Sequence, residues 1–273
     1  MTQTSAAGTY APGIETKILL GLSRHTPFGR GGLRKLMARL IRKLNQGPLD
    51  VPLYGGEARL HLVNNNSEIK ALLSPKRFAR EEYAFCAQHM PEEGGVFLDI
   101  GGNAGIFSLY VASLMKTGTL IAAEPQPEMF ERLTTNFNTM NPGLGERLEL
   151  SLQQTAVGAE TGTLTLSIPE SVGQASARRV EGVPTIDVPV TPMLEMLVSA
   201  KVDKLDLLKI DVEGFEDSIL FPFFETAPAT LHPGAIVMEC CHAGRWQRDC
   251  EALLIEKGYK IAHKDRTNMM LTK

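Results

Sequence analysis

A short segment, "VFLDIGGNAG", places an acid and three small or polar residues at alternate positions after an apolar run. These residues are Asp99, Gly101, Asn103 and Gly105. Glycine permits tight turns and lets the backbone approach a ligand closely, and Asn tolerates left-handed backbone geometry better than most residues. The spacing differs from the G-x-G-x-x-G fingerprint of dinucleotide sites. An acid before the glycines instead favours a ligand that carries a cationic group.

A second acid, Glu124, ends the apolar segment "GTLIAAEPQ", 25 residues after Asp99. An acid at the end of the second strand can accept hydrogen bonds from ribose hydroxyls, and Pro125 stops the strand directly after it. S-adenosylmethionine carries an ammonium, a sulfonium and a ribose, so the two segments together predict this ligand. The alternative is a glycine-rich turn without a ligand.

A third acidic segment, "LDLLKIDVEGFEDSIL", places Asp211 at the end of an apolar strand. Glu213 and Glu216 follow around Gly214, and we expect them to contact the substrate. They could alternatively only begin a helix, where acids are favoured. Lys209 shares a strand face with Asp211 by the two-residue period, so it could hold a carboxylate ionised.

Methyl transfer to an alcohol benefits from a base that removes the hydroxyl proton. Asp211 is the first candidate for this catalytic role. His242, at the end of the strand in "AIVMECCHAG", is the second, because histidine titrates near neutrality; it could also be a loop histidine with a structural hydrogen bond. Glu239 lies three residues earlier and is a further substrate-binding candidate. Asp211, Glu213, Glu239 and His242 could hold a divalent metal, but the spacing requires none, so we predict no metal.

The elements that position these residues alternate between strands and helices. The predicted strands cover residues 96–100, 119–124, 148–152, 205–211, 235–241, 259–263 and 268–272. The predicted helices cover residues 105–116, 127–139, 191–200, 214–225 and 245–257. This alternation predicts an α/β fold with a mostly parallel sheet and helices on both faces, whose last strand is antiparallel. Ligands then bind at the carboxyl ends of the strands.

The remainder of the chain forms a small N-terminal appendage and an insertion. We expect residues 1–16 to be disordered and residues 17–90 to hold helices and a hairpin around Gly55-Gly56. Residues 91–273 form the catalytic domain. Within it, the Thr/Val/Leu alternation at about 155–190 predicts extra strands. The insertion and the appendage are expected to shape the acceptor pocket.

Residues 17–43 contain eight Lys/Arg residues and no acid. Within this segment, residues 33–44 place leucine, isoleucine and methionine at helical spacing and basic residues on the opposite face. The helix either packs on the body with a solvated basic face, or rests on an anionic membrane or a phosphorylated substrate carrier. The net charge of −3 gives no reason to expect nucleic acid as a partner.

The remaining composition fits a cytoplasmic protein, peripheral at most to the inner membrane surface. The four cysteines form no CxxC pair and no disulfide framework. The N-terminal sequence lacks the features of a secretory signal, and no apolar run is long enough for a membrane span.

Three segments, "FLDIGGNAGIFSLYVA", "AAEPQPEMFERLTTNF" and "LLKIDVEGFEDSIL", resemble the motifs of the FkbM family of S-adenosylmethionine-dependent methyltransferases. The family's first motif commonly has Ala where this chain has Gly102, and the resemblance covers about residues 75–273. It implies a Rossmann-like class I methyltransferase fold with strand order 3-2-1-4-5-7-6. It also implies O-methylation of a hydroxyl on a sugar, a glycolipid or a polyketide-type metabolite.

We therefore predict an S-adenosylmethionine-dependent O-methyltransferase that acts on a small-molecule or glycan acceptor. Ser108 and Gln154 complete the predicted cofactor set of Asp99, Gly101, Asn103, Gly105 and Glu124. The alternatives are a nicotinamide-dependent oxidoreductase, which the glycine spacing disfavours, and a binding module without activity, which would bind no S-adenosylmethionine. An RNA methyltransferase is disfavoured because the basic stretch lies outside the predicted catalytic domain.

Overall fold

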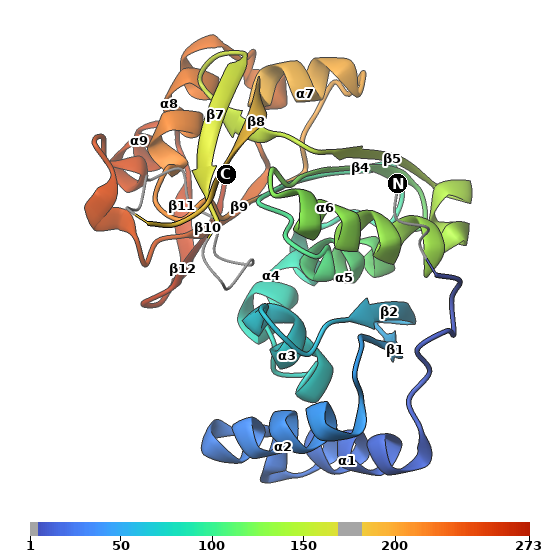
Figure 1. Cartoon of the computed structure of the whole chain (residues 1–273). Helices are drawn as coiled ribbons and strands as arrows, with labels where there is room; N and C mark the ends of the chain where they lie inside the picture. The colour runs from blue at the N-terminus through green and yellow to red at the C-terminus, as the bar shows by residue number, and fades with distance from the viewer. Residues whose placement is uncertain (1–4, 169–181) are drawn as a thin grey trace.

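The structure is a computed structural model that describes residues 5–168 and 182–273. Its central sheet has seven strands in the order β11-β12-β10-β9-β3-β4-β5 (Figure 1). These strands are β3 (Gly95–Ile100), β4 (Gly118–Ala123), β5 (Leu148–Gln153), β9 (Leu207–Ile210), β10 (Ala235–Glu239), β11 (Lys260–Lys264) and β12 (Asn268–Thr272). Only β12 runs antiparallel to its neighbours among them. Numbered along the chain from β3, the order reads 3-2-1-4-5-7-6.

Alternate residues of the sheet serve two hydrophobic cores. In β3, Phe97 packs in the core that contains α4 and α5, whereas Leu98 and Ile100 pack in the core that contains α7, α8 and α9. This is the two-residue period of a strand that is covered on both faces. Asp99 therefore points to the same face as Phe97, toward α5, which decides its role in the site.

The five helices predicted for the catalytic domain are present, apart from differences at their ends. The α-helices of the described residues are α1 (Ile14–His25), α2 (Gly31–Leu44), α3 (Asn66–Leu73), α4 (Arg80–His89), α5 (Ile106–Leu114), α6 (Pro127–Thr134), α7 (Met193–Ser199), α8 (Glu216–Thr226) and α9 (Cys250–Glu256). The predicted helix 127–139 continues from α6 as a π-helical turn over Thr135–Thr139. The predicted helix 245–257 begins later, at Cys250, because the Asp249 carboxylate accepts a hydrogen bond from the Ala252 N–H and caps it there.

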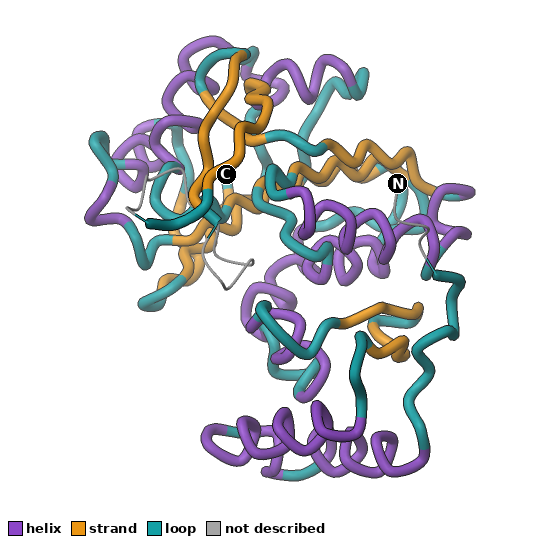
Figure 2. The backbone as a smooth tube through the Cα atoms, in the orientation of Figure 1, coloured by secondary structure: helices purple, strands orange, loops and turns teal. Residues whose placement is uncertain are grey.

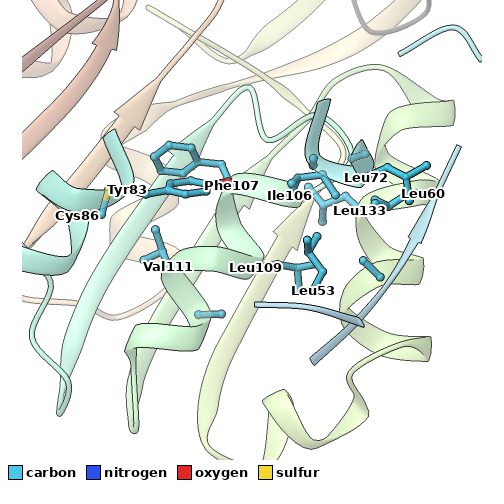
Figure 3. Close-up of a cluster of buried hydrophobic side chains, with 14 of the residues drawn as sticks. Leu53, Leu60, Leu72, Tyr83, Cys86, Ile106, Phe107, Leu109, Val111 and Leu133 are labelled. Atoms are coloured by element: carbon cyan, nitrogen blue, oxygen red, sulfur yellow. The ribbon is translucent and has the colours of Figure 1, made fainter. Parts of the chain in front are cut away.

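The N-terminal segment shares its core with the catalytic domain. Leu53 and Leu60, from the hairpin of β1 (Leu49–Leu53) and β2 (Gly56–Leu60), lie in one cluster with Leu109 and Leu133 (Figure 3). The segment is therefore packed on α5 and α6 in a core that both regions share, whereas the core around α7, α8 and α9 lies wholly within residues 91–273.

The predicted disorder of residues 1–16 is wrong for residues 5–16. The Tyr10 N–H donates to Asp50, and the Arg59 guanidinium lies 4.7 Å from the centre of the Tyr10 ring. Arg59 also donates to the carbonyl oxygens of Ser5 and Ala6. These bonds tie the start of the chain to the hairpin, a long-range pairing that local composition does not show. Residues 1–4 lie outside the described part of the chain.

The predicted insertion forms a second sheet in the order β6-β8-β7. Its strands are β6 (Ala156–Gly158), β7 (Gly162–Ser167) and β8 (Thr185–Pro192). The pair β7 and β8 is antiparallel, as expected for an insertion of this kind. Residues 169–181 of the predicted insertion lie outside the described residues.

Helices α1 and α2 lie side by side at one end of the molecule, away from the central sheet (Figure 2). The apolar positions of α2 separate into two groups: Met37 and Ile41 are buried, whereas Leu33, Leu36 and Leu44 are 44–47% exposed. Packing therefore accounts for only part of the apolar pattern. In the described part of the chain, no helix has both the length and the apolar character needed to cross a membrane.

Candidate active site

A cavity of about 1000 Å³ lies at the carboxyl ends of β3, β4, β9 and β10. Its volume suits a cofactor together with part of an acceptor. The walls come from three regions: the loops after these strands, the N-terminal segment, and the insertion strands through Leu164, Leu166 and Val190. The expectation that the appendage and the insertion shape the pocket is thus met by residues that line it.

The glycine loop after β3 has the backbone geometry that its sequence predicts. Gly101 and Gly105 have φ values of +82° and +78°, and Asn103 has +50°. A Cβ atom at Gly101 would lie 2.0 Å from the carbonyl oxygen of Asp211, so only glycine fits there. This close approach brings the end of β9 against the loop, and Gly101 and Asn103 both line the cavity.

Glu124 ends β4 and is 7% exposed, with its carboxylate against the same loop. It accepts hydrogen bonds from the Asn103 N–H at 2.8 Å and from the Gln126 N–H at 2.9 Å. Burial raises the pKa of Glu124 to about 7, although both hydrogen bonds oppose the shift. Glu124 lines the cavity, so its free lone pairs remain suited to ribose hydroxyls.

Asp99 does not line the cavity, so the structure brings it to the cofactor loop only from the buried side. Its side chain is fully buried toward α5, where it accepts a hydrogen bond of 2.5 Å from Ser108. Lys209 Nζ lies 3.2 Å from Asp99 Oδ1 and donates to the Gly101 carbonyl oxygen at 3.0 Å. Asp99 and Ser108 therefore support the glycine loop indirectly. Ser108 donates to Asp99, and Asp99 pairs with Lys209, which donates to the loop at Gly101.

The Lys209 ammonium carries its charge inside the protein. Burial alone would lower its pKa, but the charges of Asp99 and Asp211 outweigh burial, so the pKa is raised. The Asp211 Oδ2 atom lies 3.7 Å from the ammonium. The predicted sharing of one strand face by Lys209 and Asp211 is confirmed by these contacts.

Two further predicted cofactor residues lie outside the cavity wall. Gly105 packs beneath α6, where a Cβ atom would lie 3.2 Å from Leu133 and 3.3 Å from Phe137. Gln154 has an exposed side chain, and its neighbour Thr155 lines the cavity instead. The alternation of side chains along an extended segment explains why sequence position alone selected the wrong neighbour.

Three of the predicted acids line the cavity near the ends of β9 and β10: Asp211, Glu213 and Glu239. Burial and the charge of Asp211 raise the pKa of Glu239 to about 8. The same two causes raise the pKa of Glu213. One carboxyl of the group therefore retains its proton near neutral pH, because like charges at close range cannot all ionise.

His242 and Glu216 support this acidic group from outside the cavity. His242 Nε2 lies 2.9 Å from Glu213 Oε2. Glu216 is 1% exposed and accepts hydrogen bonds from the Val212 and Gly214 N–H groups and from the Trp246 indole. Glu216 thus holds the loop after β9, and it does not line the cavity.

A cluster of metal-ligand types lies beside the acids. One ligand atom each of Glu239, Cys241 and His242 lies within 4.8 Å of the others. Burial and the Glu239 carboxylate raise the pKa of the Cys241 thiol to about 12. Metals bind the thiolate, so a metal here would have to displace the thiol proton. The absence of a metal therefore stays a prediction.

A sequence model of the methyltransferase FkbM domain matches residues 99–261. The chain belongs to the FkbM methyltransferase family. The match covers the glycine loop, Glu124 and the acidic group, which are the segments that the sequence resemblance singled out. Methyltransferases of this family use S-adenosylmethionine, and this chain is an S-adenosylmethionine-dependent methyltransferase with a Rossmann-like class I fold.

Named relatives include Methyltransferase 1 of Beauveria bassiana, which is 26% identical over 182 residues, or 60% of this chain and 72% of that protein. Hexuronic acid methyltransferase AglP of Haloferax volcanii is 26% identical over 165 residues, or 60% of this chain and 63% of that protein. A solved methyltransferase structure from Geobacter sulfurreducens covers 72% of this chain and 78% of its own, with 13% identity and a TM-score of 0.42.

The cavity of this FkbM enzyme offers what S-adenosylmethionine requires. Gly101 and Asn103 line it at the end of β3, and Glu124 lines it directly after β4. The site also contains residues that sequence reasoning missed. Asn65 caps α3 and donates to the Asn103 side chain at 2.5 Å, so the N-terminal segment helps to hold the cofactor loop. In the sequence, Asn65 is recognisable only as an N-cap residue, which predicts where a helix starts but does not predict a contact with Asn103.

Proposed function

We propose that this enzyme transfers the methyl group of S-adenosylmethionine to a hydroxyl of a sugar-containing acceptor, with Asp211 as the base. The observation that carries the assignment is the place of Asp211. Asp211 lines the cavity, and its carbonyl oxygen lies against Gly101 of the glycine loop. Its carboxylate lies 3.7 Å from the Lys209 ammonium. Glu239 lies one strand further from that loop. A hydroxyl held between loop and acids lies within reach of Asp211.

The cofactor supplies an electrophilic methyl on a sulfonium. The hydroxyl oxygen forms the new bond to the methyl carbon as the carbon–sulfur bond breaks, and the sulfur keeps that electron pair. Asp211 accepts the hydroxyl proton, and the Lys209 ammonium lies 3.7 Å from its carboxylate. Glu213 and Glu239 orient the acceptor, while His242 fixes Glu213. Alignment of the reacting atoms supplies much of the rate enhancement.

The acceptor class draws support from a relative. The name of the Haloferax volcanii protein gives it a hexuronic acid as its substrate. An acid-rich cavity wall also suits polyhydroxylated rings, because carboxylates accept hydrogen bonds from hydroxyls. We therefore propose a sugar or uronic acid, free or attached to a lipid, as the acceptor.

Labelled S-adenosylmethionine and a panel of hexoses, uronic acids and glycolipids test the proposal by mass spectrometry. Asp211→Asn should lower kcat by about 10²–10⁴-fold and leave cofactor affinity unchanged. His242→Ala should lower kcat by less than about tenfold, because His242 lies behind Glu213. Asp203→Asn, an exposed change outside the cavity, is the matched control. Wild-type turnover in Asp211→Asn would reject Asp211, and activity that chelation removes would favour a metal.

We also propose that the enzyme works at an anionic membrane surface. Helix α1 exposes Ile14, Ile18 and Leu22 at four-residue spacing, and α2 exposes Leu33 and Leu36. Basic residues of the acid-free segment 17–43 occur in both helices, and such a combination of apolar and basic side chains is typical of interfacial helices. This proposal would bring the enzyme to lipid-linked acceptors.

A further inference from the structure

We propose that the N-terminal end of the cavity is a subsite for an oxyanion of the acceptor, a phosphate or a carboxylate. Four cationic side chains line this end: Arg30, Arg34, Lys70 and Arg77. The inference rests on the proposed function, because it assigns the charge of the acceptor that the enzyme methylates.

The four cations converge although they come from two segments. The Ser74 hydroxyl donates to the Gly29 carbonyl oxygen at 2.7 Å, which joins the start of α2 to the end of α3. A Cβ atom at Gly29 would lie 2.3 Å from the Ser23 carbonyl oxygen, so the join requires glycine. Arg30 directly follows Gly29, and Arg77 donates its backbone N–H to the Ser74 carbonyl oxygen. A small hollow beside the cavity is lined by both Arg30 and Arg77.

Within the described residues, no carboxylate forms an ion pair with any of these four side chains. Two other buried basic residues, in contrast, have carboxylate partners. Lys209 pairs with Asp99 and Asp211, and Arg132 pairs with Glu68 and Glu128. Cations gathered at one end of a cavity repel one another, and an oxyanion would offset that repulsion through charge-assisted hydrogen bonds.

The start of α2 adds to the positive potential. The helix has no side-chain cap and no acid in its first turn, where acids normally stabilise the positive end of the helix dipole. It carries Arg30 at the N-cap and Arg34 one turn later. At Gly31, which lines the cavity with a φ of +47°, a Cβ atom would meet open space. A ligand can therefore approach this backbone closely.

The two ends of the cavity thus have opposite charge. The acids that handle the hydroxyl come from the ends of β9 and β10, and the four cations come from the N-terminal segment, which also contributes Glu82, an acceptor from Asn268, to the cavity wall. An acceptor with a hydroxyl at one end and an oxyanion at the other fits this division, and a neutral sugar leaves the basic end unsatisfied. Arginine matches both phosphate and carboxylate geometry, so the experiment must separate the two.

Calorimetry of the full chain tests the subsite in two steps. S-adenosylhomocysteine is titrated first, and the saturated protein is then titrated at low salt with glucose 1-phosphate, glucuronate and methyl glucoside. At least one anion should bind tenfold or more tightly than methyl glucoside, and the tighter of the two identifies the phosphate or carboxylate source. Arg34→Gln/Arg77→Gln should weaken that binding at least tenfold.

Arg39→Gln/Arg42→Gln is the matched control, because it removes two charges from α2 at positions outside the cavity wall. It should change anion affinity less than twofold. Melting temperatures check folding, and Arg77→Gln alone repeats the test with a smaller change. Anions that bind no better than methyl glucoside, or an equal loss in the control pair, would overturn the subsite. Failure to bind S-adenosylhomocysteine would instead overturn the proposed function.

Discussion

At the scale of single residues, two carboxyls of the site differ in their surroundings and hence in their roles. Glu124 faces the cofactor end and is held by two backbone N–H groups. Glu239 faces the acceptor end and shares its space with other acids. Burial raises the pKa of Glu124 to about 7 and that of Glu239 to about 8, so the charge of both carboxyls depends on pH near neutrality. Backbone N–H groups fix the position of Glu124, whereas Glu239 lies among other acids.

Glu124→Ala should weaken S-adenosylmethionine binding by about 1–3 kcal/mol, the cost of hydrogen bonds lost from a charged acceptor. Calorimetry of wild type and variant measures the difference. Glu149→Gln, an exposed change on β5, should bind like wild type. Equal affinities of Glu124→Ala and wild type would refute the cofactor contact. A melting temperature for each protein shows whether the variant has lost only the contact or has also lost folding stability.

Glu239→Gln should stabilise the folded protein in a pH-dependent way. The pKa of Glu239 is about 8 in the folded chain, against an ordinary value of 4.5. The folded state therefore binds more protons between these values, and wild-type stability falls as pH rises from about 4.5 to about 8. Glutamine does not titrate, so the variant avoids this loss.

The gain at pH 8 should be about 1–2 kcal/mol, after allowance for solvent screening of a partly exposed group. Urea unfolding at pH 5, 6.5, 8 and 9 measures it, with Glu149→Gln as control. The difference from wild type should grow up to pH 8 and then level off. A difference that stays constant over this range would show that Glu239 titrates normally.

At the scale of elements, a buried ion pair stabilises the N-terminal segment itself. Arg59 Nε lies 2.7 Å from Asp50 Oδ1, and both side chains are at most 6% exposed. Burial opposes ionisation of Asp50, but the bonds from Arg59 and Tyr10 outweigh it and lower its pKa. The pair therefore locks the hairpin in register and holds residues 5–10 on it.

Asp50→Asn should destabilise the protein by about 3–5 kcal/mol, because it leaves the Arg59 charge buried without its partner. Denaturant unfolding measures the loss. Adding Arg59→Met should recover part of it, since the unpaired charge is then gone. Lys116→Met breaks an ion pair whose side chains are about two-thirds exposed, and it should cost less than about 1 kcal/mol. Similar losses in both single variants would contradict the role of burial.

At the scale of the whole molecule, the exposed apolar and basic side chains of α1 and α2 gather at the end of the molecule farthest from the central sheet. Arg30 and Arg34, two of the cations that line the cavity, lie at the start of α2. Membrane docking through these helices would therefore bring the basic end of the cavity toward the lipid surface.

The full chain should co-sediment with vesicles that contain anionic lipid and should be released at high salt. Basic side chains near such a surface contribute about 1 kcal/mol each, and salt screens that attraction. Ile18→Ser/Leu36→Ser should bind more weakly, whereas Val198→Ser, an exposed change on α7, should not. Absence of binding at low salt, or equal binding of both variants, would reject membrane docking and leave the anion subsite intact.

The sequence alone determined the sheet, the cofactor loop and the family. Strand and helix periods depend on local residue order, and glycines at Gly101 and Gly105 specify backbone geometry wherever they lie. Glu124 and Asp211 could be assigned to the cavity because the carboxyl ends of parallel strands meet at one edge.

Only the tertiary structure decided which acids face the ligand. Asp99 and Glu216 belong to the same motifs as the cavity residues, yet both carboxylates point into the protein. Asp99 lies beside Lys209, and Glu216 accepts hydrogen bonds from the backbone of the loop after β9. The acid-free N-terminal segment was visible as a charge pattern, but its division into exposed, packed and cavity-lining residues was not. Arg30 and Arg77 lie 47 positions apart along the chain, and they meet because the Ser74–Gly29 hydrogen bond joins their segments. Contacts between distant segments carry no local signal, so that part of the site emerges only on folding.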